Sequence, residues 1–244
     1  MIYDCILYNG EKNLLDIRLN ETCLCDDWVH TVIVEANKTH TGKDKPLYFE
    51  QHKDEFKNFN IMYYVVDNLP DGTPREREGF HRNQLKRALE FLEPQPHDTI
   101  IISDVDEVPR ARQVKLFKHH IQFAALIQDK YAYYLNNIES DQSWDRARIM
   151  SWDYLKNKEV DKVRNSGYDF SIHHAGWHWS WCEDPIRKLH SFFHTELDTP
   201  ENIERVEKKE NVWNDETFMK IKINLSHPEY LYKNQEKFKS LILP

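Results

Sequence analysis

Runs of apolar residues in the N-terminal half of the chain predict an α/β fold. Short runs rich in β-branched and aromatic residues predict strands, and segments with apolar residues at helical spacing predict helices. Strands are expected at residues 3–8, 28–36, 59–67 and 98–107, and helices at residues 11–23 and 78–92. This order is typical of a mainly parallel central sheet flanked by helices. We expect a single domain over residues 1–244.

The later half of the chain has a less regular pattern. Residues 112–127 are typical of a helix that runs into a strand, and residues 129–138 of a further strand. Residues 144–157 fit either a helix or a strand, and the pattern leaves both open. Thr199 and Pro200 predict the start of a charged helix, because threonine caps helices and proline suits the first helical position.

An acidic cluster follows the most apolar predicted strand. Asp104, Asp106 and Glu107 come directly after three isoleucines in the stretch TIIISDVDEVPR. Ligands of α/β sheets bind beyond the carboxyl ends of the strands, so the cluster lies where a site is expected. Two carboxylates on the same side of an extended segment suit Mn²⁺ or Mg²⁺. The alternative is that these residues cap the next turn and are otherwise solvated.

A second dense segment, HHAGWHWSWCED, contains three tryptophans at alternate positions. In an extended strand Trp177, Trp179 and Trp181 share one face and His178 lies on the other. Aromatic rings exposed in a cleft would suit the sugar ring of an acceptor, whereas the alternative is a tryptophan-rich wall of the core. Gly176 allows another segment of backbone to approach closely.

Side chains that follow this segment are candidate catalytic groups. Asp184 precedes Pro185 and is an expected helix N-cap, but a capping carboxylate at a cleft can also act as a general base. Asp184 is the first candidate for the base, with Glu183 and His178 behind it. His194, at the end of the same helix, is either a favourable end charge or a third metal ligand.

Composition narrows the class of protein. The chain has 244 residues, of which 40% are hydrophobic, and this is enough for one sizeable core. The net charge of -8 argues against a nucleic-acid binder, which needs a basic face. The apolar runs are shorter than the ~20 residues of a membrane span. No signal peptide is visible and the cysteines lack zinc spacing, so we expect free thiols and a soluble or cytoplasmic protein.

Five segments in the same order resemble glycosyltransferase family 17. They are MIYDCILYNGEKNLLDIRLNE, VIVEANKTHTGKDKPLYF, HRNQLKRAL, IIISDVDEVPR and AGWHWSWC. The resemblance implies a GT-A-type fold and an inverting, metal-dependent glycosyltransferase. It would move N-acetylglucosamine from the nucleotide sugar UDP-GlcNAc to a hydroxyl of a glycan or glycoconjugate acceptor. Animal members carry a membrane anchor and a stem, which are not visible here, so we expect a bacterial or viral origin.

The resemblance also implies roles for individual residues. Asp104 and Asp106 resemble the metal-binding pair, with Mn²⁺ or Mg²⁺ as the expected cofactor. His194 resembles a late histidine that ligates the metal in many GT-A enzymes. Trp177 and His178 fall in the Gly-Trp-His signature of the family. The expected donor-facing residues are Glu35, Arg82, Asn83 and Asp104.

Two other classes of protein stay open. A metal-dependent hydrolase of nucleotide sugars or phosphoesters would use the same aspartate pair, and would release free sugar without an acceptor. A non-catalytic carbohydrate-binding protein built on the tryptophan row would bind glycans without metal or nucleotide. The acidic cluster at a strand end argues against the carbohydrate-binding alternative.

Overall fold

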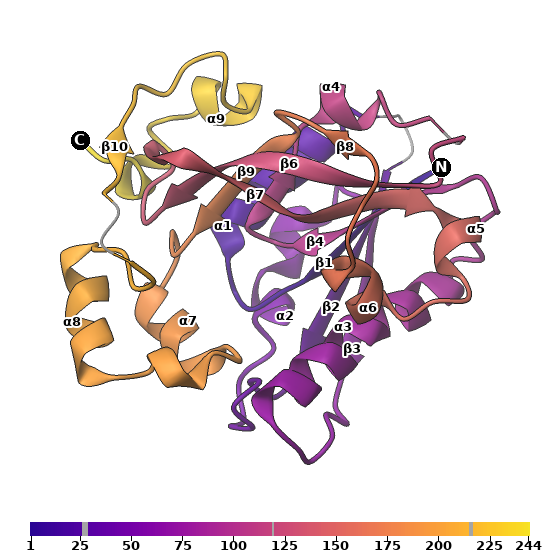
Figure 1. Ribbon diagram of the computed structural model, residues 1–244, viewed down its shortest axis with the longest axis horizontal. Coiled ribbons are helices and arrows are strands. Elements are labelled where there is room, and N and C mark those ends of the chain that lie inside the picture. The colour runs from indigo at the N-terminus through magenta and orange to yellow at the C-terminus, as the bar shows by residue number, and fades with distance from the viewer. Residues whose placement is uncertain (26–28, 119, 215–216) are drawn as a thin grey trace.

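The computed structural model describes residues 1–25, 29–118, 120–214 and 217–244. It shows an α/β fold with one large sheet and helices packed against it (Figure 1). The strands are β1 (Ile2–Leu7), β2 (Val29–Ala36), β3 (Ile61–Val66), β4 (Thr99–Asp104), β5 (Glu107–Pro109), β6 (Phe123–Ala132), β7 (Asn137–Ser151), β8 (Ser171–Ile172), β9 (Gly176–Ser180) and β10 (Met219–Lys220). The α-helices are α1 (Lys12–Thr22), α2 (Tyr48–His52), α3 (Pro74–Glu90), α4 (Ala111–Val114), α5 (Trp152–Leu155), α6 (Val160–Asn165), α7 (Pro185–Ser191), α8 (Pro200–Lys208) and α9 (Glu229–Lys233). Short 3₁₀ turns are η1 (Lys53–Phe56), η2 (Thr195–Leu197) and η3 (Lys239–Leu241).

The N-terminal strands form the parallel part of the sheet, in the order β3-β2-β1-β4. Ile100 and Ile102 of β4 pack with Leu85 of α3 on one face. On the other face, Ile6 of β1 packs with Leu15 of α1. Because helices cover both faces, β1, β2 and β4 are buried along most of their length rather than at alternate positions. The predicted strands and helices of this half are confirmed, although the predicted start of β2 at Trp28 lies outside the described residues.

The remaining strands make the sheet mixed rather than purely parallel. Strand β7 pairs antiparallel with both β4 and β6, and β9 lies parallel to β6 but antiparallel to β5. The segment 144–157, left open by its pattern, is therefore strand up to Ser151 and helix α5 after it. Within 112–127 the helix is only the short α4, and His119 lies outside the described residues.

Capping residues fix where two helices begin. Helix α3 begins at Pro74 and not at residue 78, because Thr73 and Glu76 form a capping box. The predicted start of this helix at residue 78 was wrong, since the turn-forming residues before it also encode a helix start. Thr199 caps α8 as predicted, with Pro200 at its first position.

Candidate functional site

The acidic cluster lies in the turn between β4 and β5, at the carboxyl end of the parallel strands. Strand β4 ends at Asp104 and β5 begins at Glu107, so Asp106 is on a turn and not on an extended strand. Arg18 of α1 holds this turn by donating hydrogen bonds to the carbonyls of Asp104 (2.8 Å) and Glu107 (2.9 Å). The same guanidinium pairs with Asp4 at 2.5 Å, and both side chains are completely buried.

Two guanidinium groups hold the carboxylate of Asp104. Arg82 donates to Oδ1 at 2.7 Å and Arg164 donates to Oδ2 at 2.8 Å. Arg82 also binds Glu78, and Arg164 also binds both oxygens of Glu107. Burial alone would raise the pKa of Asp104, but Arg164 and Arg82 outweigh it and hold the pKa well below its usual range. Asp104 is therefore ionised and fixed in orientation.

Asp106 pairs with a lysine and lies beside a histidine. Nζ of Lys188, on α7, is 2.7 Å from Oδ2 of Asp106, and Nε2 of His178 is 3.8 Å from the same oxygen. Burial would lower the pKa of Lys188, but Asp106 raises it overall, so the lysine is charged. Burial lowers the pKa of His178 to about 4, so its ring is neutral at neutral pH. That ring stacks on Trp144, with centroids 4.2 Å apart.

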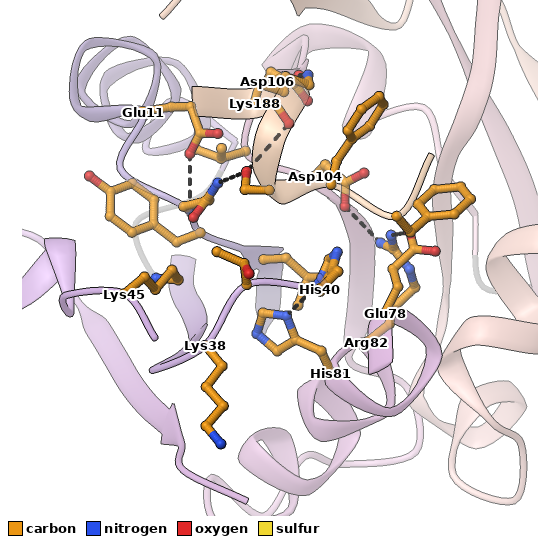
Figure 2. Close-up of a pocket in the computed structure, with 18 residues that line it drawn as sticks. Glu11, Lys38, His40, Lys45, Glu78, His81, Arg82, Asp104, Asp106 and Lys188 are labelled. Atoms are coloured by element: carbon orange, nitrogen blue, oxygen red, sulfur yellow. Dashed lines mark hydrogen bonds and ion pairs between the residues drawn. The ribbon is translucent and has the colours of Figure 1, made fainter. Parts of the chain in front are cut away.

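Two cavities meet at this cluster. The smaller, of about 160 Å³, lies at the carboxyl ends of β1 and β2, and Figure 2 shows Glu11, His40 and Lys45 around it. The larger, of about 530 Å³, is lined in part by the aromatic side chains of Trp144 and Trp213. The residues that line both cavities are Glu78, Arg82, Asp104, Asp106, Lys188, Phe192 and Phe193. A ligand in either cavity therefore reaches the same cations.

Only part of the predicted donor-facing set lines the cavities. Arg82 and Asp104 line both, whereas Glu35 and Asn83 line neither. The buried carboxylate of Glu35 accepts hydrogen bonds from Lys45 and from three other donors of the chain. Asn83 accepts from a backbone amide of α6 and so joins that helix to α3. The structure therefore does not bring Glu35 and Asn83 to the cavities, and their donor-binding role stays a prediction of the resemblance.

Two of the three predicted bases lie outside the cavities. Asp184 is the N-cap of α7, as expected, and accepts from the amide of Arg187 at 3.0 Å, with its side chain 51% exposed. Glu183 accepts from the amide of Leu14 at 2.7 Å and so holds the start of α1. His178 lines the larger cavity. Of the three predicted bases, His178 is thus the one that the structure brings to a cavity.

The tryptophan row belongs mainly to the core. Trp177 is 1% exposed and Trp179 is 0% exposed, and their rings stack with centroids 5.7 Å apart. The structure therefore places these two rings in the core and not on the wall of either cavity, as the alternative reading of the row expected. Strand β9 ends at Ser180 and Trp181 has a φ of 61°, so the alternation stops there. Trp181 does line the larger cavity.

The side chains at the cavity junction do not fit a divalent cation as they are arranged. Both oxygens of Asp104 bind guanidinium groups, and Asp106 binds Lys188. His194, the expected third ligand, follows α7 and lines the larger cavity, but its Nδ1 is 2.7 Å from Glu196. Within the described ranges, no three His, Cys, Asp or Glu side chains gather closely enough to hold an ion. Mn²⁺ or Mg²⁺ stays a prediction of the resemblance.

Sequence reasoning missed three charged residues at the site. Lys188 lies 82 positions from Asp106 in the chain, and Arg164 lies 60 positions from Asp104. Neither stands in a recognisable local pattern, so only the fold brings them in. Glu11 lines the smaller cavity, where burial and the nearby Asp106 raise its pKa to about 7. Glu11 lies in the connection that follows β1, and residues that follow strand ends are candidates for ligand contact in α/β sheets. This position was the signal that the sequence offered.

Comparison with known proteins gives the family. The family model described as glycosyltransferase family 17 matches residues 1–227. The beta-1,4-mannosyl-glycoprotein 4-beta-N-acetylglucosaminyltransferases of Rattus norvegicus and Homo sapiens are each 24% identical over 222 residues. These alignments cover 75% of this chain but 40% and 41% of the relatives. The chain thus spans about two fifths of the length of these curated relatives.

Two solved structures are also similar. The S. aureus TarS crystal structure has 14% identity and a TM-score of 0.39, over 74% of this chain and 37% of TarS. The T. maritima inositol-1-phosphate CTP transferase has 9% identity and a TM-score of 0.39, over 99% of this chain and 98% of that chain.

The relatives and the helices bear on the expected origin of the protein and on its relation to a membrane. The matched curated relatives named above are mammalian, so they give no support to the expected bacterial or viral origin. Within the described ranges, none of the helices combines the length and the apolar character that a bilayer crossing requires.

Proposed function

The chain belongs to glycosyltransferase family 17, and we therefore propose that it transfers a sugar from a nucleotide-sugar donor to a hydroxyl of a glycan acceptor. The proposed donor is UDP-GlcNAc, and the proposed transfer inverts the anomeric configuration on a GT-A-type fold. The N-acetylglucosaminyltransferase names of the curated relatives support this donor. The observation that carries the proposal is the meeting of two cavities at Asp104 and Asp106.

The two cavities suit the two substrates. The smaller one lies beyond the ends of β1 and β2, where nucleotides bind in α/β sheets, and would take the nucleoside. The larger one carries the rings of Trp144, Trp213 and Phe193, which suit the apolar faces of sugar rings. Arg82 and Lys188 line both cavities, so a diphosphate that joins nucleoside to sugar would lie against them.

The chemistry follows from this arrangement. The acceptor oxygen bonds to the anomeric carbon, the bond from that carbon to the diphosphate breaks, and its electron pair goes to the diphosphate oxygen. Arg82 and Lys188 stabilise this developing charge by charge-assisted hydrogen bonds. The acceptor proton goes to the neutral imidazole of His178, and Asp106, 3.8 Å away, stabilises the imidazolium that forms.

A donor and acceptor panel tests the proposal. The full chain is incubated with UDP-GlcNAc, UDP-glucose, UDP-galactose or GDP-mannose, with and without N-glycan acceptors, and the products are identified by mass spectrometry and NMR. We expect UDP-GlcNAc to be consumed only with an acceptor, giving a β-linked product. Sugar release at the same rate without acceptor would instead identify a hydrolase. Glycan binding with no turnover of any donor would identify a carbohydrate-binding protein.

A further inference from the structure

We propose that Lys188, and not a bound metal ion, supplies the positive charge that binds the donor diphosphate, so that donor binding needs no divalent cation. The inference rests on the proposed function and deepens it. Nζ of Lys188 lies 2.7 Å from Asp106 and 3.5 Å from the hydroxyl of Ser180, at the junction of the two cavities. An ammonium group has three protons, so these two contacts leave a third for a phosphate oxygen.

The carboxylates at the junction are already paired with cations of the protein. Asp104 and Asp106 are in direct contact with Arg82, Arg164 and Lys188. Both guanidinium groups also bind a glutamate, so three cationic side chains are distributed among four carboxylates. Hard divalent cations select sites where carboxylate oxygens are in excess.

The lysine side chain can serve the diphosphate without a rearrangement of the fold. Its ammonium stands at the end of a flexible four-carbon stem, whereas Arg82 and Arg164 are locked in place by paired hydrogen bonds. Small rotations of that stem can aim the third proton of Nζ at a phosphate oxygen in the same junction, while Nζ keeps its contact with Asp106.

Calorimetric titration of the full chain with UDP tests this inference. It is run in EDTA and in Mn²⁺, on the wild type, Lys188→Gln, Lys188→Arg and the control Lys208→Gln. Lys208 is exposed on α8 and pairs only with Glu204 among the ion pairs of the described residues, so it matches the charge change away from the site. Thermal unfolding without ligand establishes that each variant folds.

The expected result is equal UDP affinity of the wild type in EDTA and in Mn²⁺. Lys188→Gln should weaken binding about 10- to 100-fold in both conditions, the loss expected for one hydrogen bond to a charged group. Lys188→Arg should retain most of the affinity and Lys208→Gln all of it. A wild type that binds UDP at least tenfold more weakly in EDTA would overturn the inference and leave the glycosyltransferase proposal standing. Absence of UDP and UDP-sugar binding in every condition would overturn both.

Discussion

The proposed catalytic base is His178, the one of the three predicted bases that lines a cavity. Replacing His178 by Gln should lower kcat about 10²- to 10⁴-fold, the usual contribution of a general base, while UDP binding is kept. Asp184→Asn should retain transfer, because its carboxylate caps α7 outside both cavities and asparagine also caps helices. Steady-state kinetics with calorimetric UDP binding separates the two roles. Loss of transfer in a normally folded Asp184→Asn protein would return the role to Asp184.

Arg18 is the residue that holds the turn carrying the site. Arg18→Met should lower the free energy of unfolding by about 3 to 5 kcal/mol, because it leaves the completely buried carboxylate of Asp4 without its partner. Urea unfolding measures the loss. The double variant Asp4→Asn with Arg18→Met serves as the control and should recover part of it, since no buried charge is then left unpaired. A loss under about 1 kcal/mol in the single variant would show that Asp4 finds another partner.

At the scale of elements, the pairing of β9 with β5 depends on a single glycine. Gly176 has a φ of 150°, and a Cβ there would lie 2.0 Å from the carbonyl oxygen of Val108. Gly176→Ala should therefore cost about 2 to 5 kcal/mol through backbone strain and overpacking. Because β9 carries His178 opposite Glu107 of β5, transfer should fall as well.

Gly167→Ala is the matched control for that prediction. A Cβ at Gly167 meets nothing within 4 Å, so the stability should stay within about 0.5 kcal/mol of the wild type. Thermal and urea unfolding of both variants provide the comparison. Equal stability of the two variants would mean that β5 and β9 separate freely at this point.

The elements were predictable where a single pattern determines them. The three isoleucines of β4 indicate a strand covered on both faces, and the structure confirms that burial. The start of α3 was missed because Thr73 and Glu76 form a cap inside a segment whose composition is typical of a loop. Strand β7 was left open because its pairing with β4 and β6, and not its own periodicity, determines its conformation.

At the scale of the whole molecule, the site was predictable only where it is local in the chain. Asp104 and Asp106 follow a buried strand, so the sequence places them at the sheet edge. Lys188 and Arg164 reach them from later segments, and no local rule couples positions so far apart. The metal expectation rests on the two aspartates and on the family resemblance, and neither includes the cations that pair with those aspartates. Charge partners across a fold are thus the part of a site that a single sequence hides.

The stability of the whole molecule should depend on pH through its buried histidines. Burial lowers the pKa of His40, His178 and His227 to about 4 from an ordinary 6.5. Between those values the unfolded chain binds protons that the folded protein excludes, so stability is full above pH 6.5 and is lost as the pH falls towards 4. The carboxyl of Glu11 has a pKa raised from 4.5 to about 7, so between these values the folded protein keeps a proton that the unfolded chain releases. Its contribution to stability is therefore lost as the pH rises, opposite to that of the histidines.

Four histidines, with His81 as the fourth, have a lowered pKa, whereas Glu11, Glu21 and Glu183 have a raised one. The histidines outnumber the glutamates, so the free energy of unfolding should fall as the pH drops below 6.5, by about 1.4 kcal/mol per pH unit for each net proton that the unfolded chain binds. Urea unfolding at a series of pH values from 7.5 to 5 measures this slope. His227 lines neither of the two cavities, so His227→Leu should leave the site unchanged. It should reduce the slope by the contribution of one proton, about 1.4 kcal/mol per pH unit. A stability that stays constant or rises as the pH falls from 6.5 to 5 would mean that these histidines gain solvent in the folded state and are already protonated there.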